Sequence, residues 1–295
     1  VLLDIGDHMD RMAAETEGSE GAANVDILNL TGYDAVTIGN NEGLTYTSEI
    51  LNRAYAGILC PVVCSNVIEH KTGVPPVWMD THRIIEKGGW TIGLIGATAP
   101  YGDFYELLGW DVTEPGASLA PLVQEIRGQV DLLVLLSHLG LATDQRLAEE
   151  LPELDVILGG HSHHVLERPL WIGETVLGAA GKFGHYMGQM CWQKSADGGR
   201  PKLLDGGLIP TGEEDMPRDE KVEAAIEMHR ERAAERMGRT VAILEEPLDI
   251  DYEQESPLGN LLAQAVRRYT GTELSIVNSG QLLGPLPAGE ISEAM

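Results

Sequence analysis

The sequence of 295 residues predicts a layered α/β protein, with sheets flanked by helices, followed by the beginning of a second α/β domain. The first observation is an alternation of short apolar runs with helical stretches, which favours an α/β layered domain. The second is that several runs, such as residues 130–136, are apolar throughout, as strands covered on both faces are. The third is a change of composition at residues 196–218, which are rich in Gly, Pro and acidic residues and are expected to form a loop.

The elements of the first domain follow from this alternation. Strands are expected at residues 1–5, 34–38, 61–67, 91–97, 130–136, 155–158, 175–179 and 186–192. Helices are expected at about residues 20–31, 46–57, 117–128 and 143–151.

The C-terminal third has its own pattern. Residues 219–237 form a strong helical pattern with one apolar face and one charged, solvated face. A second helix is expected at residues 257–269, because Ser256 and Pro257 suit its first turn. A strand at residues 273–277 is expected to follow. The expected organisation is a first domain at residues 1–210, a linker helix at residues 211–239 and the beginning of a second domain at residues 240–295.

The net charge of −26 limits the partners of the protein. Such a field repels nucleic-acid backbones and acidic membranes, so we expect no nucleic-acid partner. A small phosphate can still bind where a local metal charge outweighs the global field. The composition, 43% hydrophobic and 22% charged, is that of a soluble globular protein, and no apolar run approaches the ~18 residues of a membrane-spanning helix.

Three cysteines, Cys60, Cys64 and Cys191, make a poor disulfide framework, because their number is odd and their spacing does not match a zinc site. We expect all three to be small buried apolar residues, which slightly favours a cytoplasmic location. No signal peptide is visible, but the chain opens on Val1 inside an expected strand and stops at Met295 with no closing feature. We therefore expect a fragment, and export stays open.

Polar residues gather directly after four of the expected strands. The clusters are Gly6-Asp7-His8, Gly39-Asn40-Asn41-Glu42, Ser137-His138 and Gly159-Gly160-His161-Ser162-His163-His164. In layered α/β folds, sites are built at the edge where the strands' carboxyl ends meet. The four clusters are therefore expected to share one site.

The residue types in these clusters suit two divalent metal ions. Ions ~3.5–4 Å apart need a carboxylate between them, neutral imidazoles around them and open positions for water and phosphate. Asp7 can bridge the ions, and Asn40 can supply an amide oxygen. The remaining candidate ligands are His138, His161 and His163. Such ions polarise phosphoryl oxygens and supply a hydroxide at neutral pH.

The ordered set of motifs resembles the calcineurin-like metallophosphoesterases. The motifs are GD at 6–7, GN at 39–40, SH at 137–138 and GHSH at 160–163. ESPLGNLLA at 255–263 and NSGQLL at 278–283 resemble the start of the C-terminal domain of bacterial 5'-nucleotidases and UDP-sugar hydrolases, and GKFG at 181–184 fits the same group. The resemblance covers nearly the whole chain and implies a β-sandwich flanked by helices, with residues 1–210 as its catalytic domain.

The resemblance also implies a role for each candidate ligand. Asp7 would bridge both ions, and His163 would bind the first. The second ion would be bound by Asn40, His138 and His161. The family's other ligands for the first ion lie in an Asp-x-His motif upstream of the GD motif, so this chain is expected to hold its second ion better than its first. Mn²⁺, Zn²⁺, Mg²⁺, Co²⁺ and Fe²⁺ all suit such mixed ligands.

Asn41 departs from the family pattern. Relatives usually read GNHE here, and their His contacts the phosphate and helps the leaving group depart. An amide can donate a hydrogen bond to a phosphoryl oxygen but cannot deliver a proton, and loss of general-acid help typically costs about 10²–10⁴-fold in rate. His8, beside the bridging Asp7, is an alternative catalytic acid, although a side chain in that position more often packs or faces water.

The C-terminal segment departs from the pattern as well. Asn278 and Gly280 match a substrate-binding motif, Asn-x-Gly-Gly-Ile-Arg, but Gln281 and Leu283 stand at the positions of the second Gly and the Arg. The family's base-stacking aromatic residues would lie after Met295. Nucleotide specificity is therefore less certain than phosphoester hydrolysis.

Three functions remain open. The first is a two-metal phosphoester hydrolase that acts on nucleotides or nucleotide sugars, with a small phosphorylated substrate as its partner. The second is a hydrolase of the same fold for another phosphate ester, such as a cyclic nucleotide. The third is a catalytically impaired protein that binds a ligand.

Ordinary structural roles remain open for single residues. Asp7 could cap a helix, His138 could be a hydrogen-bonded core residue, and Asn40 could form an Asx turn with its neighbour. Asn278 and Gly280 could form only the turn between a strand and a loop. The joint occurrence of four clusters at four strand ends favours the metal site.

Overall fold

The computed structural model describes residues 1–195, 198–212 and 217–295. It divides into two compact units, Val1–His229 and Arg230–Met295. The division falls inside helix α8 (Glu220–Met237). The domain boundaries at residues 210 and 239 stay a prediction.

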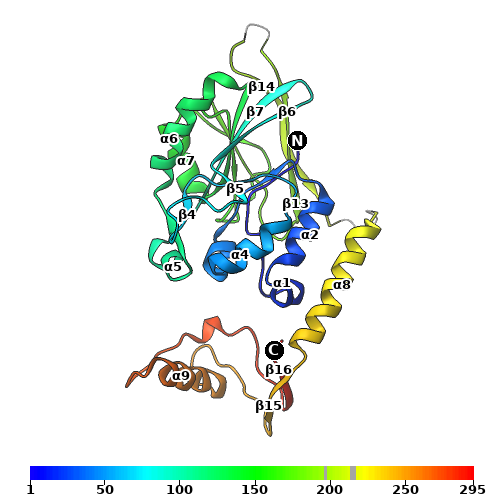
Figure 1. Cartoon of the computed structure of the whole chain (residues 1–295), viewed down its shortest axis with the longest axis vertical. Coiled ribbons are helices and arrows are strands. Elements are labelled where there is room, and N and C mark those ends of the chain that lie inside the picture. The colour runs from blue at the N-terminus through cyan, green and yellow to red at the C-terminus, as the bar shows by residue number, and fades with distance from the viewer. Residues whose placement is uncertain (196–197, 213–216) are drawn as a thin grey trace. The chain divides into compact units, whose positions relative to one another are not determined.

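Two sheets build the N-terminal unit (Figure 1). The strands of the four-stranded sheet are all parallel and lie in the order β1 (Leu3–Asp4), β2 (Ala35–Val36), β3 (Val62–Val63) and β5 (Met79–Asp80). The six-stranded sheet has the order β11 (Leu170–Ile172), β12 (Thr175–Ala179), β10 (Val156–Gly159), β9 (Leu132–His138), β7 (Trp90–Thr98) and β6 (His82–Lys87). Its four inner strands are parallel, and both edge strands are antiparallel to their neighbours.

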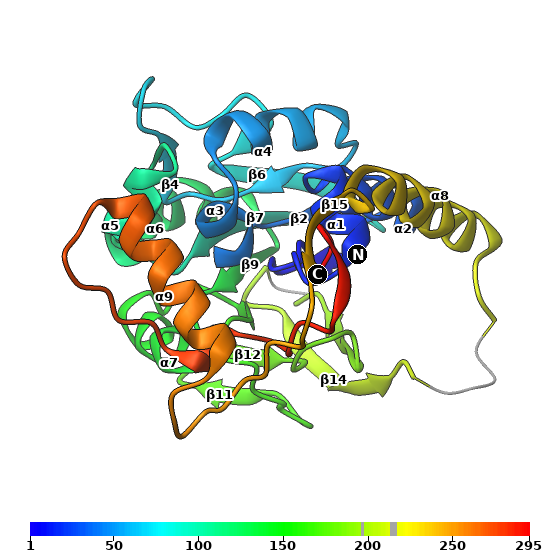
Figure 2. The same cartoon turned by 90° about the horizontal axis from the view of Figure 1, so that it is seen from below.

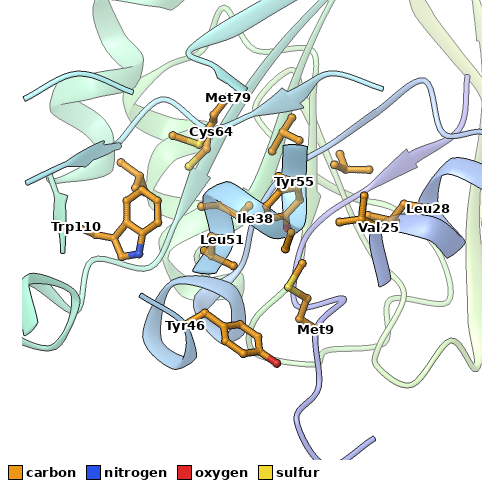
Figure 3. Close-up of a cluster of buried hydrophobic side chains, with 14 of the residues drawn as sticks. Met9, Val25, Leu28, Ile38, Tyr46, Leu51, Tyr55, Cys64, Met79 and Trp110 are labelled. Atoms are coloured by element: carbon orange, nitrogen blue, oxygen red, sulfur yellow. The ribbon is translucent and has the colours of Figure 1, made fainter. Parts of the chain in front are cut away.

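The two sheets pack face to face, and helices cover their outer faces. Between the sheets, Ala35 and Val63 belong to the same buried cluster as Leu94 and Val134. On the far side of the four-stranded sheet lie α2 (Ala22–Thr31) and α4 (Ser48–Ala54), whose apolar residues join the buried cluster in Figure 3. On the far side of the six-stranded sheet lie α6 (Pro115–Ile126) and α7 (Leu141–Glu150), so that α4 and α7 lie on opposite sides of β7 and β9 (Figure 2). The predicted sandwich flanked by helices is confirmed.

The unbroken apolar run in β9 has a simple cause. Leu133 and Leu135 pack toward α6 and α7, whereas Leu132, Val134 and Leu136 pack toward the second sheet. A strand that is covered on both faces needs apolar residues at every position. This central strand carries His138 at its carboxyl end.

Several elements differ from the sequence prediction. The expected strand 61–67 is two short strands, β3 and β4 (Val67–Glu69), and β4 pairs with β8 (Trp110–Val112). The expected helix 20–31 begins two residues later, as α2 (Ala22–Thr31), because Glu20 and Gly21 have left-handed backbones, with φ of 53° and 85°. The expected helix 46–57 ends in a 3-10 turn, Tyr55–Gly57. Three short helices were not predicted: α1 (Ala14–Ser19), α3 (Asn40–Thr45) and α5 (Gly102–Leu107).

The prediction of a loop over residues 196–218 is wrong for its central part. Strand β14 (Lys202–Pro210) pairs with β13 (Tyr186–Gln193) in an antiparallel ribbon. Gly206 and Gly207 lie inside β14 and hide its strand pattern. A Cβ on Gly206 would lie 2.7 Å from Pro169 Cγ, so close packing explains that glycine. Residues 196–197 and 213–216 of the expected loop lie outside the described residues.

The C-terminal unit is smaller. Strand β15 (Thr240–Leu244) pairs with β16 (Gly289–Ser292), and helix α9 (Pro257–Thr270) begins at Ser256, whose hydroxyl accepts a hydrogen bond from the backbone N–H of Gly259. The expected strand 273–277 is wrong. Within the described part of the chain no strand pairs with it, and Leu274 and Ile276 are exposed.

The cysteines do not all follow the expectation. Cys64 is buried and Cys60 is half-buried, but Cys191 on β13 is exposed, so the prediction of three buried thiols is wrong for that residue. Strand β13 belongs to a two-stranded ribbon, which leaves more of its side chains in solvent than a strand inside the sandwich. In the described part of the chain, no helix has both the length and the apolar character needed to span a membrane.

Helix α3 is held by a close contact with α5. A Cβ on Gly43 of α3 would lie 2.2 Å from Cε1 of Tyr105, a fully buried ring on α5. The ring of Tyr105 therefore occupies the space that a side chain at residue 43 would need.

We expect Gly43→Ala to lower the free energy of unfolding by about 1–2 kcal/mol, because overpacking against a buried ring costs more than the helix propensity of Ala returns. Gly57→Ala is the matched control, since a Cβ at Gly57 meets nothing within 4 Å. Urea unfolding of the two variants checks this. Equal stabilities would show that the Tyr105 ring can move aside.

Candidate metal centre

The strand ends bring the predicted ligands to one edge of the two sheets. Asp7 follows β1 and Asn40 begins α3 after β2, at the carboxyl ends of two parallel neighbours. His138 ends β9 and His161 follows β10, which are parallel neighbours in the other sheet. Parallel strands end at a common edge, so each sheet supplies two of the four side chains.

The loops that carry Asp7 and Asn40 touch through their backbones. A Cβ on Gly6 would lie 2.4 Å from the backbone nitrogen of Gly39, and a Cβ on Gly39 would lie 2.1 Å from Oδ1 of Asp7. The backbone N–H of Asn41 donates a hydrogen bond to the same Oδ1 at 2.7 Å. Glycine at residues 6 and 39 is therefore required for the two loops to approach each other.

Glu42 fastens these loops, a role that the sequence did not reveal. Its carboxylate is fully buried, and Oε2 accepts hydrogen bonds from the backbone N–H groups of Gly39 at 2.6 Å and Asp7 at 3.0 Å. Oε1 accepts a third from the N–H of Met9 at 2.8 Å. One carboxylate thus satisfies three backbone donors from two loops that are distant in sequence.

The ring of His138 is set for ligation through Nε2. Nδ1 lies 2.7 Å from the carbonyl oxygen of Ile5, which can only accept, so Nδ1 carries the ring proton. Nε2 is buried and makes no hydrogen bond, although it lies 3.1 Å from Oδ2 of Asp7. An imidazole lone pair and a carboxylate oxygen therefore face the same point, and the backbone fixes the tautomer, as is usual for metal-ligating histidines.

His161 and Asn40 form a second pair of donors. Nδ1 of His161 lies 2.7 Å from Oδ1 of Asn40, and its ring lies 5.3 Å from the ring of His138, centre to centre. Nε2 of His161 lies 2.9 Å from the phenol oxygen of Tyr101. Tyr101 was not predicted, although it follows strand β7 at the same edge as the other clusters.

Three of the predicted ligands have a left-handed backbone. The φ angles are 58° at Asp7, 66° at His161 and 57° at His163. Among the described residues, only two other non-glycine residues, Glu20 and Phe183, have a positive φ of this kind. Such a conformation costs about 1–3 kcal/mol per residue and is concentrated at functional sites.

The charges of the site are coupled. Burial alone would raise the pKa of Asp7, but the contact with His138 and the N–H of Asn41 hold it below its ordinary value. Burial opposes protonation of His138, yet the adjacent Asp7 carboxylate raises the pKa of that imidazole. Burial and the neighbouring His138 lower the pKa of His161. The ionised carboxylate of Asp7 and the neutral imidazole of His161 are thus favoured in the forms that bind a cation, whereas a protonated His138 would release its proton on binding one.

The donor atoms of these residues are of the kinds that bind a divalent ion, but they are not spaced to surround one. In the described part of the chain, no group of three or more His, Cys, Asp or Glu side chains is arranged to hold a metal ion. Asn40 is not one of those residue types. Asp7 is in direct contact with His138, and Asn40 with His161. The unpartnered Nε2 of His138 is the observation that supports ligation.

A cavity of about 1330 Å³ opens beside these residues. Its lining includes Asn41, His163, Lys182 and Phe183 in addition to the four donors. His163 is exposed, and Asn41 is half-buried with its Oδ1 3.3 Å from Nδ2 of Asn40. Both residues can therefore reach a phosphate in the cavity.

His8 is engaged with other residues. Its Nδ1 lies 3.2 Å from Asp4 and its Nε2 lies 2.6 Å from the hydroxyl of Tyr55. The side chain is 8% exposed. Its role as a catalytic acid stays a prediction, and these partners give it a structural role as well.

Asn278 and Gly280 lie in the C-terminal unit. The Asn278 side chain accepts a hydrogen bond from the N–H of Gly280 at 2.9 Å, and it caps a 3-10 turn, Ser279–Gln281. Both residues are exposed. The structure thus shows the turn, and a role in substrate binding stays a prediction.

A buried carboxyl group lies behind His138. Asp144 on α7 is 1% exposed and accepts a hydrogen bond from the hydroxyl of Ser137, the residue before His138. Its Oδ2 is buried and makes no hydrogen bond. Burial raises the pKa of Asp144 to about 7, although its bond with Ser137 opposes the shift.

The chain is similar to several known proteins. Residues 237–294 match the model of the 5'-nucleotidase C-terminal domain. An uncharacterized metallophosphoesterase, YunD of Bacillus subtilis, is 38% identical over 295 residues, which are 99% of this chain and 63% of that protein. The 5'-nucleotidase of Mus musculus is 21% identical over 88% of this chain and 51% of its own length. The chain thus spans one half to two thirds of these relatives.

Solved structures show the same fold. The 5'-nucleotidase precursor of Thermus thermophilus superposes with a TM-score of 0.71 at 22% identity, over 99% of this chain and 71% of that one. At this identity the likeness concerns the fold alone.

Asp144 predicts a pH dependence of stability. Below its ordinary pKa of 3.8 the carboxyl is protonated in both states, and between that value and about 7 it ionises only in the unfolded chain. Its contribution to the free energy of unfolding therefore falls as pH rises through this window and is constant above it. In Asp144→Asn this dependence is absent.

We expect the stability difference between wild type and Asp144→Asn to move in favour of the variant from pH 4.5 to pH 7.5. Urea unfolding at several pH values measures it, with Asp103→Asn, at an exposed position, as the control. A difference that does not vary with pH would mean that Asp144 is ionised in the folded protein.

Proposed function

We propose that the chain is a two-metal phosphoester hydrolase of the calcineurin-like 5'-nucleotidase type, acting on nucleotides or nucleotide sugars, on the premise of its similarity to the relatives described above. The similarity of the chain to these relatives, and of its C-terminal segment to the 5'-nucleotidase C-terminal domain, supports phosphoester hydrolysis as the reaction. The substrate is carried over from relatives that are named 5'-nucleotidases.

One observation carries the proposal. Asp7 Oδ2 and the orphaned Nε2 of His138 face each other at 3.1 Å beside a cavity that Asn40 and His161 also line. A core histidine with only a structural role would have both ring nitrogens satisfied. A buried imidazole lone pair beside a carboxylate is suited to a cation.

The residues have distinct tasks in this proposal. Asp7 would bind both ions, and His163 would bind one of them. The other ion would be bound by Asn40, His138 and His161. When bound, Mn²⁺, Zn²⁺, Mg²⁺, Co²⁺ or Fe²⁺ would supply Lewis-acid polarisation of the phosphoryl group and activation of water. Glu42 holds the backbone of Asp7, and the Ile5 carbonyl holds the imidazole ring of His138, so these donors are oriented before substrate arrives.

Asn41 sets the kind of ester that suits the site. Its side chain lines the cavity, and its amide can donate a hydrogen bond to a phosphoryl oxygen. An amide cannot protonate a leaving group, so esters with good leaving groups are favoured. The same residue supports a second candidate, a phosphodiesterase that acts on an ester such as a cyclic nucleotide.

Product formation from 5'-AMP, UDP-glucose and a cyclic nucleotide, with Mn²⁺ and chromatography of the products, tests the proposal. We expect turnover of at least one substrate, lost on chelation of the metal and reduced at least about 100-fold in His161→Ala. His70→Ala, at an exposed histidine that pairs with Asp111, is the matched control. Turnover that survives both chelation and His161→Ala would refute the proposed centre.

Asn41→His should restore a proton donor at the cavity. We expect the rate with 5'-AMP, a substrate with a poor leaving group, to rise about 10-fold or more, because general-acid help contributes about 10²–10⁴-fold. The rate with p-nitrophenyl phosphate should change little.

Asn41→Gln is the control for this variant, since it changes the length of the side chain but supplies no proton. Steady-state kinetics with both substrates decides. Equal changes for the two substrates would show that residue 41 acts on binding rather than on departure of the leaving group.

A further inference from the structure

Among the described residues, Tyr101 forms a hydrogen bond with His161 and is not one of the predicted ligands. It lies in the turn after β7, and its hydroxyl is 2.9 Å from Nε2 of His161. The two rings are tilted by 55°, with centres 5.9 Å apart. The Tyr101 side chain is partly open to solvent, with 41% of the residue exposed.

The turn that carries Tyr101 is firmly placed. The carbonyl oxygen of Tyr101 accepts hydrogen bonds from the N–H groups of Phe104 at 3.0 Å and Tyr105 at 3.2 Å, which begin helix α5. Tyr105 is fully buried against Gly43, as described for the fold. The position of the phenol is thus fixed by α5 and α3, and α3 also carries Asn40.

The partners of His161 determine which ring nitrogen carries its proton. The Oδ1 atom of Asn40 can only accept, so Nδ1 of His161 donates to it. Nε2 is then a lone pair, and the hydroxyl of Tyr101 must donate to it. Both ring nitrogens are hydrogen-bonded, but Nδ1 faces Asn40, itself a candidate ligand, so binding through Nδ1 would bring both residues to one ion.

We propose that Tyr101 is a positioning residue for His161. The hydroxyl of Tyr101 donates a hydrogen bond to His161 when no ion is bound and accepts one from His161 when a divalent ion is bound; this inference rests on the proposed function. When Nδ1 binds a cation it holds no proton, so the ring proton moves to Nε2. Nε2–H then donates to the phenol oxygen of Tyr101. The phenolic O–H, no longer used by His161, is released toward solvent, to which Tyr101 is partly open.

The reversal conserves protons and bonds. One proton leaves Nδ1 and one arrives at Nε2, while the Tyr101–His161 hydrogen bond persists with its direction inverted. Such partners of ligating histidines fix ring orientation and typically change metal affinity by about 10–100-fold.

Tyr101→Phe tests the inference because it keeps the ring and removes only the hydroxyl. We expect the dissociation constant for Zn²⁺, measured by calorimetry on the whole chain, to rise about 10-fold. Tyr269→Phe, at a tyrosine that is 94% exposed, removes a hydroxyl elsewhere and should bind Zn²⁺ as wild type does. Urea unfolding without metal verifies that both variants are folded.

Long-range ¹H–¹⁵N spectra of the imidazoles provide a readout that a purely structural role would not move. In wild type we expect the His161 signal, assigned by its loss in His161→Ala, to change from the Nδ1–H to the Nε2–H tautomer on addition of Zn²⁺. Wild-type Zn²⁺ affinity in Tyr101→Phe, or an unchanged tautomer in wild type with Zn²⁺ bound, would overturn the inference and leave the proposed function standing. If wild type binds no Zn²⁺ at all, the proposed metal centre itself fails.

Discussion

The buried carboxylate of Glu42 is the constraint on which the site depends. It binds the N–H groups of Asp7, Met9 and Gly39, and so joins the turn after β1 to the turn after β2. Without such an acceptor, three backbone donors would be buried with no partner, at about 1–3 kcal/mol each. The backbone contact at Gly39 then holds Asp7 in its left-handed conformation, pointing at His138. Both sheets are needed to complete this arrangement, because His138 returns a hydrogen bond to the carbonyl of Ile5.

The layered fold could be predicted from the sequence because burial on both faces leaves an unmistakable pattern. Continuous apolar runs marked β7, β9 and β10, and these are the strands that carry or flank the ligands. Strand β14 was not predicted because Gly206 and Gly207 interrupt its apolar pattern. A side chain at residue 206 would clash with Pro169, which belongs to another segment. The expected strand at 273–277 failed for the opposite reason: its residues suit a strand, but strand formation needs a partner.

The site was predictable to a similar degree. The clusters after four strands indicated Asp7, Asn40, His138 and His161, and the structure brings these four together. Glu42 and Tyr101 escaped because their importance lies in partners that are distant in sequence, namely backbone donors for the first and the Nε2 of His161 for the second. A motif shows which residue types are present, whereas the direction of a hydrogen bond depends on the folded geometry.

The bond between His138 and Ile5 spans 133 residues, and that between His161 and Asn40 spans 121. Contacts between residues so far apart in sequence form late in folding, because closing a long loop costs conformational entropy before the contacts can stabilise the chain. A nascent chain would carry Asp7 and Asn40 for a long interval before His138 and His161 emerge from the ribosome. The proposed site is therefore complete only after the two sheets have come together, and binding of a metal ion there would follow that step.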